Sequence, residues 1–446
     1  MQCLISENLE SFFGQLTDPP DKILLAYSGG LDSSVLLHAL RKCCSQYNFS
    51  LSAIHVDHQL QNASTQFSDF CNDQCMAYQV PLKIKQVCID ENSGESIEAM
   101  ARHARYEVFH KCIESKTYLL TAHHADDQIE TFFLQLLRGA GPKGLGSMQH
   151  VQDFGAGKLA RPFLHLSRQQ LLAYAQQHKI EYIDDPSNLS ERFDRNYLRQ
   201  AILPLLQQRW PGSDQSILRS IQHIATEHKV LSEILEKKLH KLVIGNVLHI
   251  NEFLQQAVEL QPLLLRQWVE LCGHQQPSTK ILNEIQKQIL NTSPESNTRI
   301  SWSNVEIRAY QNKVYIMRCF PDSALQALHG QELCAGQSLV LPEKYGSLSF
   351  ASNDREAPSL QVRFRVGGEK IRCKITQPSR SLKQLFNEKR VFPWMRSRIP
   401  LLFDGGDLVA VADLWVDADW LEQQKTRGFQ VQWANRPAIF ADQGAS

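Results

Sequence analysis

The hydrophobic pattern of the first 125 residues alternates between short apolar runs and amphipathic stretches. The apolar runs at 23–28, 51–56, 81–87 and 117–124 have the length and composition of strands. Residues 32–44 and 68–79 carry apolar side chains at helical spacing. Strands that alternate with helices predict an α/β fold with a parallel sheet and helical crossovers.

Beyond Pro211 the pattern changes to long amphipathic stretches, such as 216–243 and 260–272, which predict helices. A strand-like segment follows at 305–318, and a further unit begins near Leu360. We therefore predict three domains. They are a Rossmann-like parallel-sheet domain at 1–214, a mostly helical domain at 215–335 and a small α+β domain at 336–446.

Composition narrows the class of protein. The 446-residue chain has 43% hydrophobic and 21% charged residues, which is typical of a globular protein. No apolar run reaches the roughly 18 residues that a membrane span needs, and the N-terminus has no basic region, so we expect a cytoplasmic protein without membrane contact. The 11 cysteines show no Cys-x-x-Cys spacing, which favours reduced thiols.

The link between the first predicted strand and its helix carries the first candidate chemistry. Gly29 and Gly30 permit a tight turn, and Asp32, Ser33 or Ser34 can cap the helix. Such a turn directs backbone N–H groups and the positive end of the helix dipole toward one point, which suits a phosphate. Hydroxyl groups that can add hydrogen bonds are those of Ser28, Ser33 and Ser34. The alternative is a well-capped strand–helix junction that binds no ligand.

Two other phosphate motifs do not apply. The chain has no Gly-x-x-x-x-Gly-Lys-Ser/Thr motif. The tract at 139–144 matches Gly-x-Gly-x-x-Gly but follows a helical run rather than a strand, so we interpret it as a helix end and a mobile loop.

The segment after the fourth predicted strand places a histidine and carboxylates near the same edge. If that strand ends near His123, then His123, Asp127 and Glu130 lie at i, i+4 and i+7 on one helical face. The carboxylates can bind Mg²⁺ or a cationic substrate, or they can simply complement the positive helix N-terminus. Arg102 and Arg105 share another predicted helical face, which suits phosphate binding or solvent exposure.

The string Ser-Gly-Gly-Leu-Asp-Ser at 28–33 resembles the signature of the PP-loop ATP pyrophosphatases, a superfamily with several activities. Further motifs narrow the resemblance: HVDHQL (55–60), EAMARHARYEVF (98–109), AHHADDQIET (122–131), LLRGAGPKGLGSM (136–148), RPFL (161–164), DDPSN (184–188) and DRNYLR (194–199). Together with residues 362–416, they are similar to the tRNA(Ile)-lysidine synthetase family over nearly the whole chain. The resemblance implies that the first domain is a PP-loop ATPase domain.

The resemblance also implies a reaction. The wobble cytidine in the CAU anticodon of an isoleucine tRNA would become lysidine, so that the tRNA reads AUA instead of AUG. The cytosine O2 would attack the α-phosphorus of ATP, with Mg²⁺ assisting, and pyrophosphate would leave. The amine of free L-lysine would then displace AMP at C2. The oligomeric state stays open between a monomer and a homodimer.

The reaction that the resemblance implies assigns a role to each candidate site residue. The predicted nucleotide-binding residues are Ser28, Gly29, Gly30, Leu31, Asp32 and Ser33. Asp127 and Glu130 are candidates for binding the incoming lysine, one of them also accepting its proton. Arg105 is a candidate contact to ATP or the transition state, and His123 contacts the nucleotide or the activated base, or is structural. We assign no residue as a metal ligand.

A tRNA partner predicts a basic surface, and residues 361–400 carry 11 basic and 2 acidic residues, a net charge of +9 in a chain whose formal charge is zero. Phe386, Phe392 and Trp394 lie among these charges, which predicts a surface that binds phosphates and stacks on bases. The alternative is a solvated face balanced by the acidic stretch after Asp404. A second predicted basic face consists of Arg192, Arg195 and Arg199.

Three other functions remain open from the sequence alone. A PP-loop tRNA thiolase would need cysteines that carry or ligate sulfur, and the spacing of Cys71 and Cys75 does not favour it. A nucleotide-binding regulator would bind ATP without chemistry. A glutamine-dependent amidotransferase would need a glutaminase segment, and none is recognisable.

Overall fold

The computed structural model describes residues 4–47, 49–57, 64–87, 97–184, 193–290, 299–319, 325, 327–342, 345–354 and 357–440. The chain forms two compact units, 1–231 and 232–446, and helix α10 (Ser213–Leu242) crosses the boundary between them. Each unit is described by itself. The bounds of the three predicted domains stay predictions.

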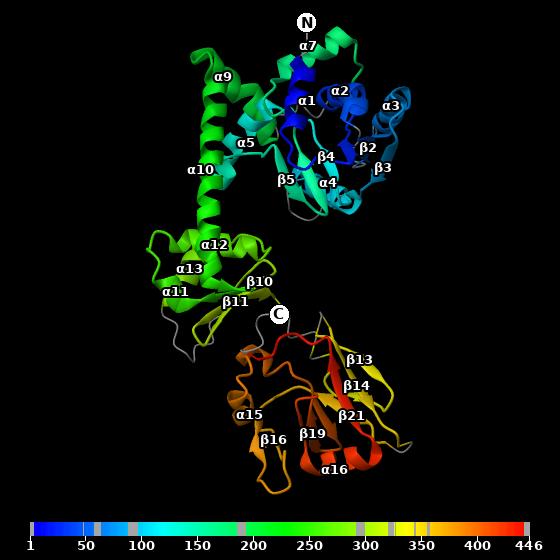
Figure 1. Ribbon diagram of the computed structural model, residues 1–446, viewed down its shortest axis with the longest axis vertical. Coiled ribbons are helices and arrows are strands. Elements are labelled where there is room, and N and C mark those ends of the chain that lie inside the picture. Colours follow the sequence, from blue (N-terminus) through cyan, green and yellow to red (C-terminus); the bar gives the residue numbers. More distant parts are fainter. Residues whose placement is uncertain are drawn as a thin grey trace. The chain divides into compact units, whose positions relative to one another are not determined.

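The first unit is built on a six-stranded sheet in the order β3-β2-β1-β4-β6-β5 (Figure 1). Its strands are β1 (Lys22–Ala26), β2 (Ser50–Asp57), β3 (Leu82–Gln86), β4 (Thr117–Leu120), β5 (Val151–Phe154) and β6 (Gly157–Ala160). Only β5 pairs antiparallel, with β6. This confirms the predicted parallel sheet.

Helices cover both faces of this sheet because the central strands are apolar on both faces. The helices are α1 (Leu4–Gly14), α2 (Leu31–Tyr47), α3 (Ser64–Ala77), α4 (Ile97–Cys112), α5 (Ala125–Leu137), α6 (Pro142–Leu145), α7 (Arg168–His178), α8 (Asp194–Tyr197) and α9 (Leu203–Arg209), with a π-helical turn at Leu198–Ile202. Leu25 of β1 shares a core with Leu36 of α2, whereas Leu24 shares the opposite core with Phe109 of α4. Because β1, β4 and β6 are parallel neighbours in the sheet, the loops that follow these strands meet at the same edge.

The structure of the glycine tract after α5 differs in part from the prediction. The predicted helix end is confirmed, since α5 ends at Leu137. Within the predicted loop, Pro142–Leu145 form the one-turn helix α6, and the mobility of the tract stays a prediction. A Cβ atom at Gly146 would lie 3.2 Å from the Cα of Ala225 in α10, so glycine permits close packing there.

The second unit begins with the predicted helices and adds a sheet to them. Helices α11 (Ile250–Leu254), α12 (Gln261–Leu271) and α13 (Thr279–Leu290) accompany the end of α10. A five-stranded antiparallel sheet has the order β7-β8-β11-β10-β9. Its strands are β7 (Val243–Ile244), β8 (Val247–His249), β9 (Arg299–Trp302), β10 (Val305–Tyr310) and β11 (Lys313–Arg318). The strand-like segment predicted at 305–318 is the β10–β11 hairpin.

The rest of this unit is rich in strands. One sheet has the order β12-β15-β18-β19-β20, a second has the order β13-β14-β21, and β16 pairs with β17. These strands are β12 (Gln331–Leu333), β13 (Ser338–Val340), β14 (Ser347–Ala351), β15 (Leu360–Arg363), β16 (Lys370–Ile371), β17 (Arg380–Ser381), β18 (Leu401–Asp404), β19 (Asp407–Val411), β20 (Trp415–Val416) and β21 (Gln430–Ala434). With α15 (Leu382–Glu388) and α16 (Ala418–Arg427), they confirm the predicted α+β character.

The prediction that aromatic residues of 361–400 stack on bases is wrong. Phe386, Phe392 and Trp394 are 0%, 4% and 7% exposed. Phe392 and Trp394 stack on each other with ring centroids 4.6 Å apart, and both contact Tyr315 of β11. Charge and aromatic residues alternate here because the segment is amphipathic, with its rings in the core and its charges outside.

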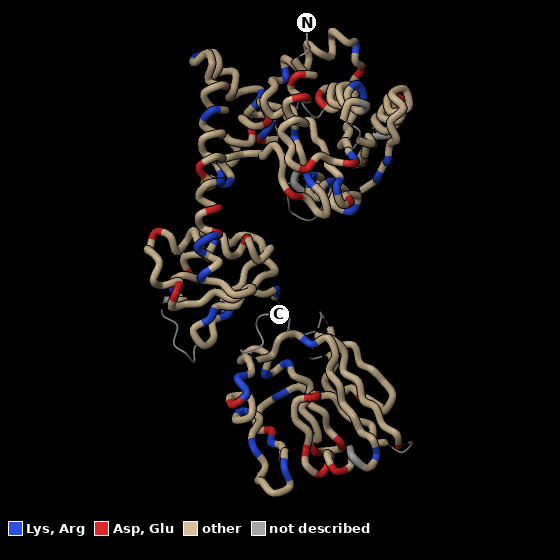
Figure 2. Tube along the Cα trace, viewed as in Figure 1, with Lys and Arg blue, Asp and Glu red and all other residues tan. Residues whose placement is uncertain are grey.

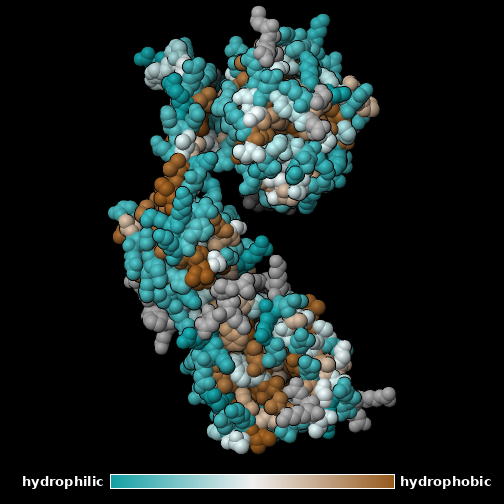
Figure 3. Space-filling model, in the orientation of Figure 1, coloured by the Kyte–Doolittle hydropathy of each residue, from teal (hydrophilic) through white to brown (hydrophobic). Residues whose placement is uncertain are grey.

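Among the described residues, no helix is long and apolar enough to cross a membrane. Much of the surface seen in Figure 3 is hydrophilic.

Candidate active site

The loop between β1 and α2 forms the tight turn that the sequence predicted. Gly29 has a φ of +81°, which glycine adopts without strain. Its carbonyl oxygen accepts hydrogen bonds from the Ile183 amide (3.0 Å) and from the Ser34 hydroxyl (3.4 Å). The helix begins at Leu31, so Asp32, Ser33 and Ser34 lie in its first turn and not at the predicted cap position before it.

The serine hydroxyls of this loop differ in their roles. Ser33 is buried, and its hydroxyl donates to the Gly30 carbonyl (3.1 Å) while accepting from the Ser28 amide (3.3 Å). It therefore shapes the loop. Ser28 is exposed, and its hydroxyl lies 3.1 Å from that of Ser33 and accepts a long hydrogen bond from the Gly30 amide (3.4 Å). Of the three predicted hydroxyl ligands, Ser28 is the one that faces solvent.

Two further residues of the loop have distinct environments. The Leu31 side chain is buried in the core, so only its backbone is available to a nucleotide. Asp32 is half-buried, and its Oδ1 atom is buried without a hydrogen-bond partner among the described residues. A carboxylate oxygen in that state is suited to a cation.

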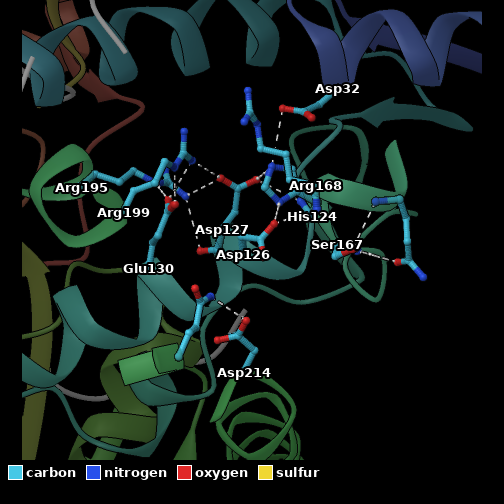
Figure 4. A network of polar contacts seen from close by, with 12 residues as sticks. Asp32, His124, Asp126, Asp127, Glu130, Ser167, Arg168, Arg195, Arg199 and Asp214 are labelled. Carbon is cyan, nitrogen blue, oxygen red and sulfur yellow. Dashed lines mark hydrogen bonds and ion pairs between the residues drawn. The ribbon is translucent and has the colours of Figure 1, made fainter. Parts of the chain in front are cut away.

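His124 connects this loop to the carboxylates of α5 (Figure 4). Its Nε2 lies 3.6 Å from Asp32 Oδ2 and 3.5 Å from Asp127 Oδ2, and its Nδ1 lies 3.4 Å from Asp126 Oδ2. Burial alone would lower the pKa of His124, but the surrounding carboxylates, Asp127 foremost, raise that pKa to about 10. The imidazole is therefore a cation at neutral pH.

The His124 cation predicts a pH dependence of stability. Its folded pKa lies above the ordinary value near 6.5, so its stabilising contribution is complete below about pH 6.5 and is lost as the pH rises through about 10. We expect the melting temperature of the wild type to fall between pH 7 and pH 10 by on the order of 5 °C more than that of His124→Gln. The exposed His223 of α10 offers the control His223→Gln. If the melting temperatures of the wild type and His124→Gln fall by the same amount between pH 7 and pH 10, the assignment of His124 as a cation is contradicted.

Asp127 and Glu130 lie three residues apart near the start of α5, and two arginines bind them. Glu130 is 0% exposed, and its two oxygens each lie 2.6 Å from a guanidinium nitrogen, one of Arg195 and one of Arg199. Arg195 also lies 3.0 Å from Asp127 Oδ1. Asp127 Oδ2 accepts a hydrogen bond from the His124 amide (3.0 Å). Although burial opposes it, the positive charges of His124 and Arg195 hold the pKa of Asp127 far below its usual range.

The predicted basic face of Arg195 and Arg199 differs from the structure. Both guanidinium groups neutralise carboxylates of α5, so they form a buried ion-pair cluster rather than a free basic surface. The two residues project to the same partner because they are four apart around the helical turn where α8 meets the π-helical segment. Arg192 lies outside the described residues.

His123 lies before α5 and not on its face, because β4 ends at Leu120 and the helix begins at Ala125. Its Nδ1 lies 2.8 Å from the Thr121 hydroxyl. Burial, and after it the charges of nearby arginines, lower the pKa of His123 to about 3, so the ring is neutral at pH 7. Arg105 is half-buried on α4. The roles predicted for both residues stay predictions.

Sequence reasoning missed His124 and the pairing of Arg195 and Arg199 with α5. The signal for His124 was its place directly before the run Ala-Asp-Asp-Gln, where the residue preceding a helix meets the carboxylates of its first turn. The two arginines are 65 and 69 residues away from Glu130, so only the tertiary fold brings them together.

The predicted basic surface of the second unit is present in reduced form (Figure 2). Arg372 pairs with Asp419, Arg380 pairs with Glu388, and Arg398 is buried. The cations that remain exposed on the β16–β17 hairpin and around α15 are Lys370, Lys374, Lys383, Lys389 and Arg390, which we call the C-terminal basic surface.

Comparisons with known proteins agree along the chain. Residues 1–206 match a PP-loop domain, residues 248–315 the TilS substrate binding domain and residues 360–433 the TilS substrate C-terminal domain. The tRNA(Ile)-lysidine synthase of Coxiella burnetii is 36% identical over 91% of this chain and 91% of its own. The chain belongs to the tRNA(Ile)-lysidine synthase family. The tRNA(Ile)-lysidine synthase of Serratia proteamaculans is also 36% identical, over 93% of this chain and 96% of its own.

Membership of the tRNA(Ile)-lysidine synthase family confirms the predicted resemblance, and the PP-loop match confirms that the first domain is an ATP-binding one. A solved structure of a U34-tRNA thiolase from Methanococcus maripaludis covers 50% of this chain and 78% of its own, with 20% identity and a TM-score of 0.43. That likeness is too low to bear on function.

Proposed function

We propose that this protein is an ATP-dependent ligase that joins free L-lysine to C2 of the wobble cytidine in a CAU-anticodon isoleucine tRNA, forming lysidine. The observation that carries the proposal is the direct link, through His124, between the phosphate-type loop at 28–33 and the buried carboxylates of α5, in a chain of this family. One site can thus serve both a triphosphate and a cationic amine.

The first step activates the base. The cytosine O2 bonds to the α-phosphorus of ATP, and the bond from that phosphorus to the β-phosphate oxygen breaks. Negative charge gathers on the leaving pyrophosphate. The groups proposed to stabilise that charge are the amides of Gly29 and Gly30, the Ser28 hydroxyl and the α2 dipole.

Asp32 is the residue that fits Mg²⁺ at this loop, because its buried Oδ1 has no partner among the described residues. The described residues contain no group of three His, Cys, Asp or Glu side chains that could hold a metal alone. This suits Mg²⁺, which proteins commonly bind through one or two carboxylates together with substrate phosphates. When bound, the ion would neutralise charge on the phosphates.

The second step joins lysine to the activated base. The lysine ammonium first loses one proton to a base, the resulting free amine bonds to C2, AMP leaves with the former O2, and the new C–N nitrogen releases a second proton to solvent. Asp127 and Glu130 are our candidates for binding the ammonium. Because Arg195 and Arg199 occupy their oxygens, lysine binding here requires that the ammonium replaces a guanidinium. Arg105 is proposed to contact ATP, and neutral His123 to hydrogen-bond with the nucleotide or the base.

The properties of the cysteines near the loop argue against a thiolase. Cys71 and Cys75 are buried, and burial raises the pKa of Cys71 to about 12 and that of Cys75 to about 11. A sulfur-carrying cysteine needs an accessible thiolate at neutral pH. Neither residue meets this requirement.

The C-terminal basic surface is proposed to bind the phosphate backbone of the tRNA. The double variant Lys383→Glu, Lys389→Glu is expected to weaken tRNA binding at least tenfold and to reduce the salt dependence of the dissociation constant. Filter binding at several salt concentrations measures both. The control Lys111→Glu removes an exposed lysine from α4 of the first unit. If the double variant binds like the control, the surface does not contact tRNA.

Pyrophosphate release tests the proposed function. With ATP present, release should require the CAU-anticodon tRNA, and AMP should accumulate only when lysine is added. Release without tRNA, or AMP formation that another amine supports equally well, would contradict the proposal.

A further inference from the structure

Arg161 lies at the active edge of the sheet but has no role in the chemistry described so far. It directly follows β6, whose last residue Ala160 pairs with Leu120 of β4. The amide of Thr121 donates to the Ala160 carbonyl (3.0 Å). Arg161 therefore leaves the sheet beside the segment that carries His123.

The Arg161 side chain is buried and has no counter-ion among the residues that the structure describes. It is 3% exposed, and its Nη1 donates to the Gln149 carbonyl (2.8 Å) and to the side chain of Gln152 (3.2 Å). Among the described residues, Arg161 has no carboxylate partner and its Nε atom has no hydrogen-bond partner. A buried cation in this state is costly unless an anion compensates it.

Tyr106 of α4 connects Arg161 to a second arginine. The Arg102 guanidinium lies 4.8 Å above the Tyr106 ring, and its Nη2 donates to the Tyr106 hydroxyl (3.4 Å). The Tyr106 side chain is also close enough to Arg161 to raise the pKa of its guanidinium, which burial lowers. Arg102 is exposed, so the pair presents one accessible and one buried cation around a single tyrosine.

The environment of His123 shows which part of the site the positive charges of these arginines reach. Arg161, Arg195 and Arg102 all lower the pKa of His123, and Asp127 opposes them. Arg195 is already compensated by Asp127 and Glu130. Of these three arginines, Arg161 and Arg102 are the two that form no ion pair with a carboxylate in the described part of the chain.

We propose that Arg102, Tyr106 and Arg161 form a second phosphate site, apart from the 28–33 loop, which binds a backbone phosphate of the tRNA next to the wobble nucleotide. Arg102 contacts the phosphate, Tyr106 orients the Arg102 guanidinium, and the buried Arg161 adds positive potential beside them. The inference rests on the proposed function, in which two substrates carry phosphate groups, namely ATP and the tRNA. The loop at β1 already serves the triphosphate, so the site beside β6 is left for the polynucleotide.

The variant Arg102→Gln in the full-length protein tests the site. Loss of one charged contact is expected to weaken tRNA binding about tenfold and to lower the salt slope of log Kd by about 1, with KM for ATP unchanged. Lys111→Gln, on the same helix, is the matched control. A rise in KM for ATP alone would keep the phosphate site and assign it to the nucleotide. Unchanged tRNA affinity, salt slope and KM would overturn it.

Arg161 and Tyr106 need variants that keep the fold. Tyr106→Phe preserves the ring and removes the hydroxyl that accepts from Arg102, so we expect severalfold weaker tRNA binding without a change in melting temperature. Arg161→Gln should weaken binding similarly, and Arg161→Lys should restore part of it. Equal binding by Tyr106→Phe and the wild type would remove Tyr106 from the site, and equal binding by Arg161→Gln would remove Arg161. If the wild type itself incorporates no lysine, the proposed function fails instead, so the two failures are distinguishable.

Discussion

Replacing Glu130 with glutamine is expected to lower the stability of the first unit by about 3 to 5 kcal/mol, because it leaves two guanidinium groups around a buried, uncharged side chain. For a unit of this size that corresponds to a fall in melting temperature on the order of 10 °C. If Glu130 also binds lysine, incorporation should fall about 100-fold or more at temperatures where the variant is folded.

The exposed ion pair between Glu114 and Lys22 provides the control. The Lys22 Nζ and a Glu114 carboxylate oxygen lie 2.7 Å apart, but the Glu114 side chain is 69% exposed, so solvent screens the pair and Glu114→Gln should leave the melting temperature almost unchanged. Calorimetric melting of the wild type and both variants separates the two cases. A Glu130→Gln protein with the stability and activity of the wild type would refute the role of the cluster.

The second large effect is expected for Gly29→Ala. A Cβ atom at this position would lie 3.1 Å from Cys71 Sγ and 3.3 Å from the Phe70 ring, and the φ of +81° adds about 1 to 2 kcal/mol of backbone strain. Because relief of the clash would move the amides that we propose to bind the phosphates, we expect tRNA-dependent pyrophosphate release to fall about 100-fold.

Two further variants isolate the cause. Gly336→Ala meets a similar φ of +80° with nothing within 4 Å, so it should lose stability but not activity. Adding Cys71→Ala to Gly29→Ala should recover part of the activity by giving the Cβ atom room. If Gly29→Ala releases pyrophosphate at the wild-type rate, the loop does not bind the phosphates through its amides.

Local patterns predicted the part of the site that depends on local geometry. The spacing of apolar residues, two glycines and serines around β1 and α2 is sufficient to predict the tight turn. It does not fix the first residue of the helix, so the pattern offers Asp32, Ser33 or Ser34 as the cap residue, whereas all three lie in the first turn of α2.

Contacts between distant segments were beyond the sequence. Nothing near Glu130 indicates that Arg195 and Arg199 bind it, since the fold alone brings these positions together. The burial of Phe386 could have been predicted, because Leu382, Leu385 and Phe386 lie at i, i+3 and i+4 and form the apolar face of α15. The high count of basic residues favoured an exposed segment, whereas the apolar spacing of α15 indicates that these three side chains are buried.

The most direct test of the proposed function is ATP-dependent incorporation of labelled lysine into an isoleucine tRNA transcript with a CAU anticodon, beside the same transcript with a changed wobble base. The account predicts incorporation only into the first transcript, with one pyrophosphate released for each lysine joined. Pyrophosphate release without incorporation, or equal incorporation into both transcripts, would contradict lysidine synthesis.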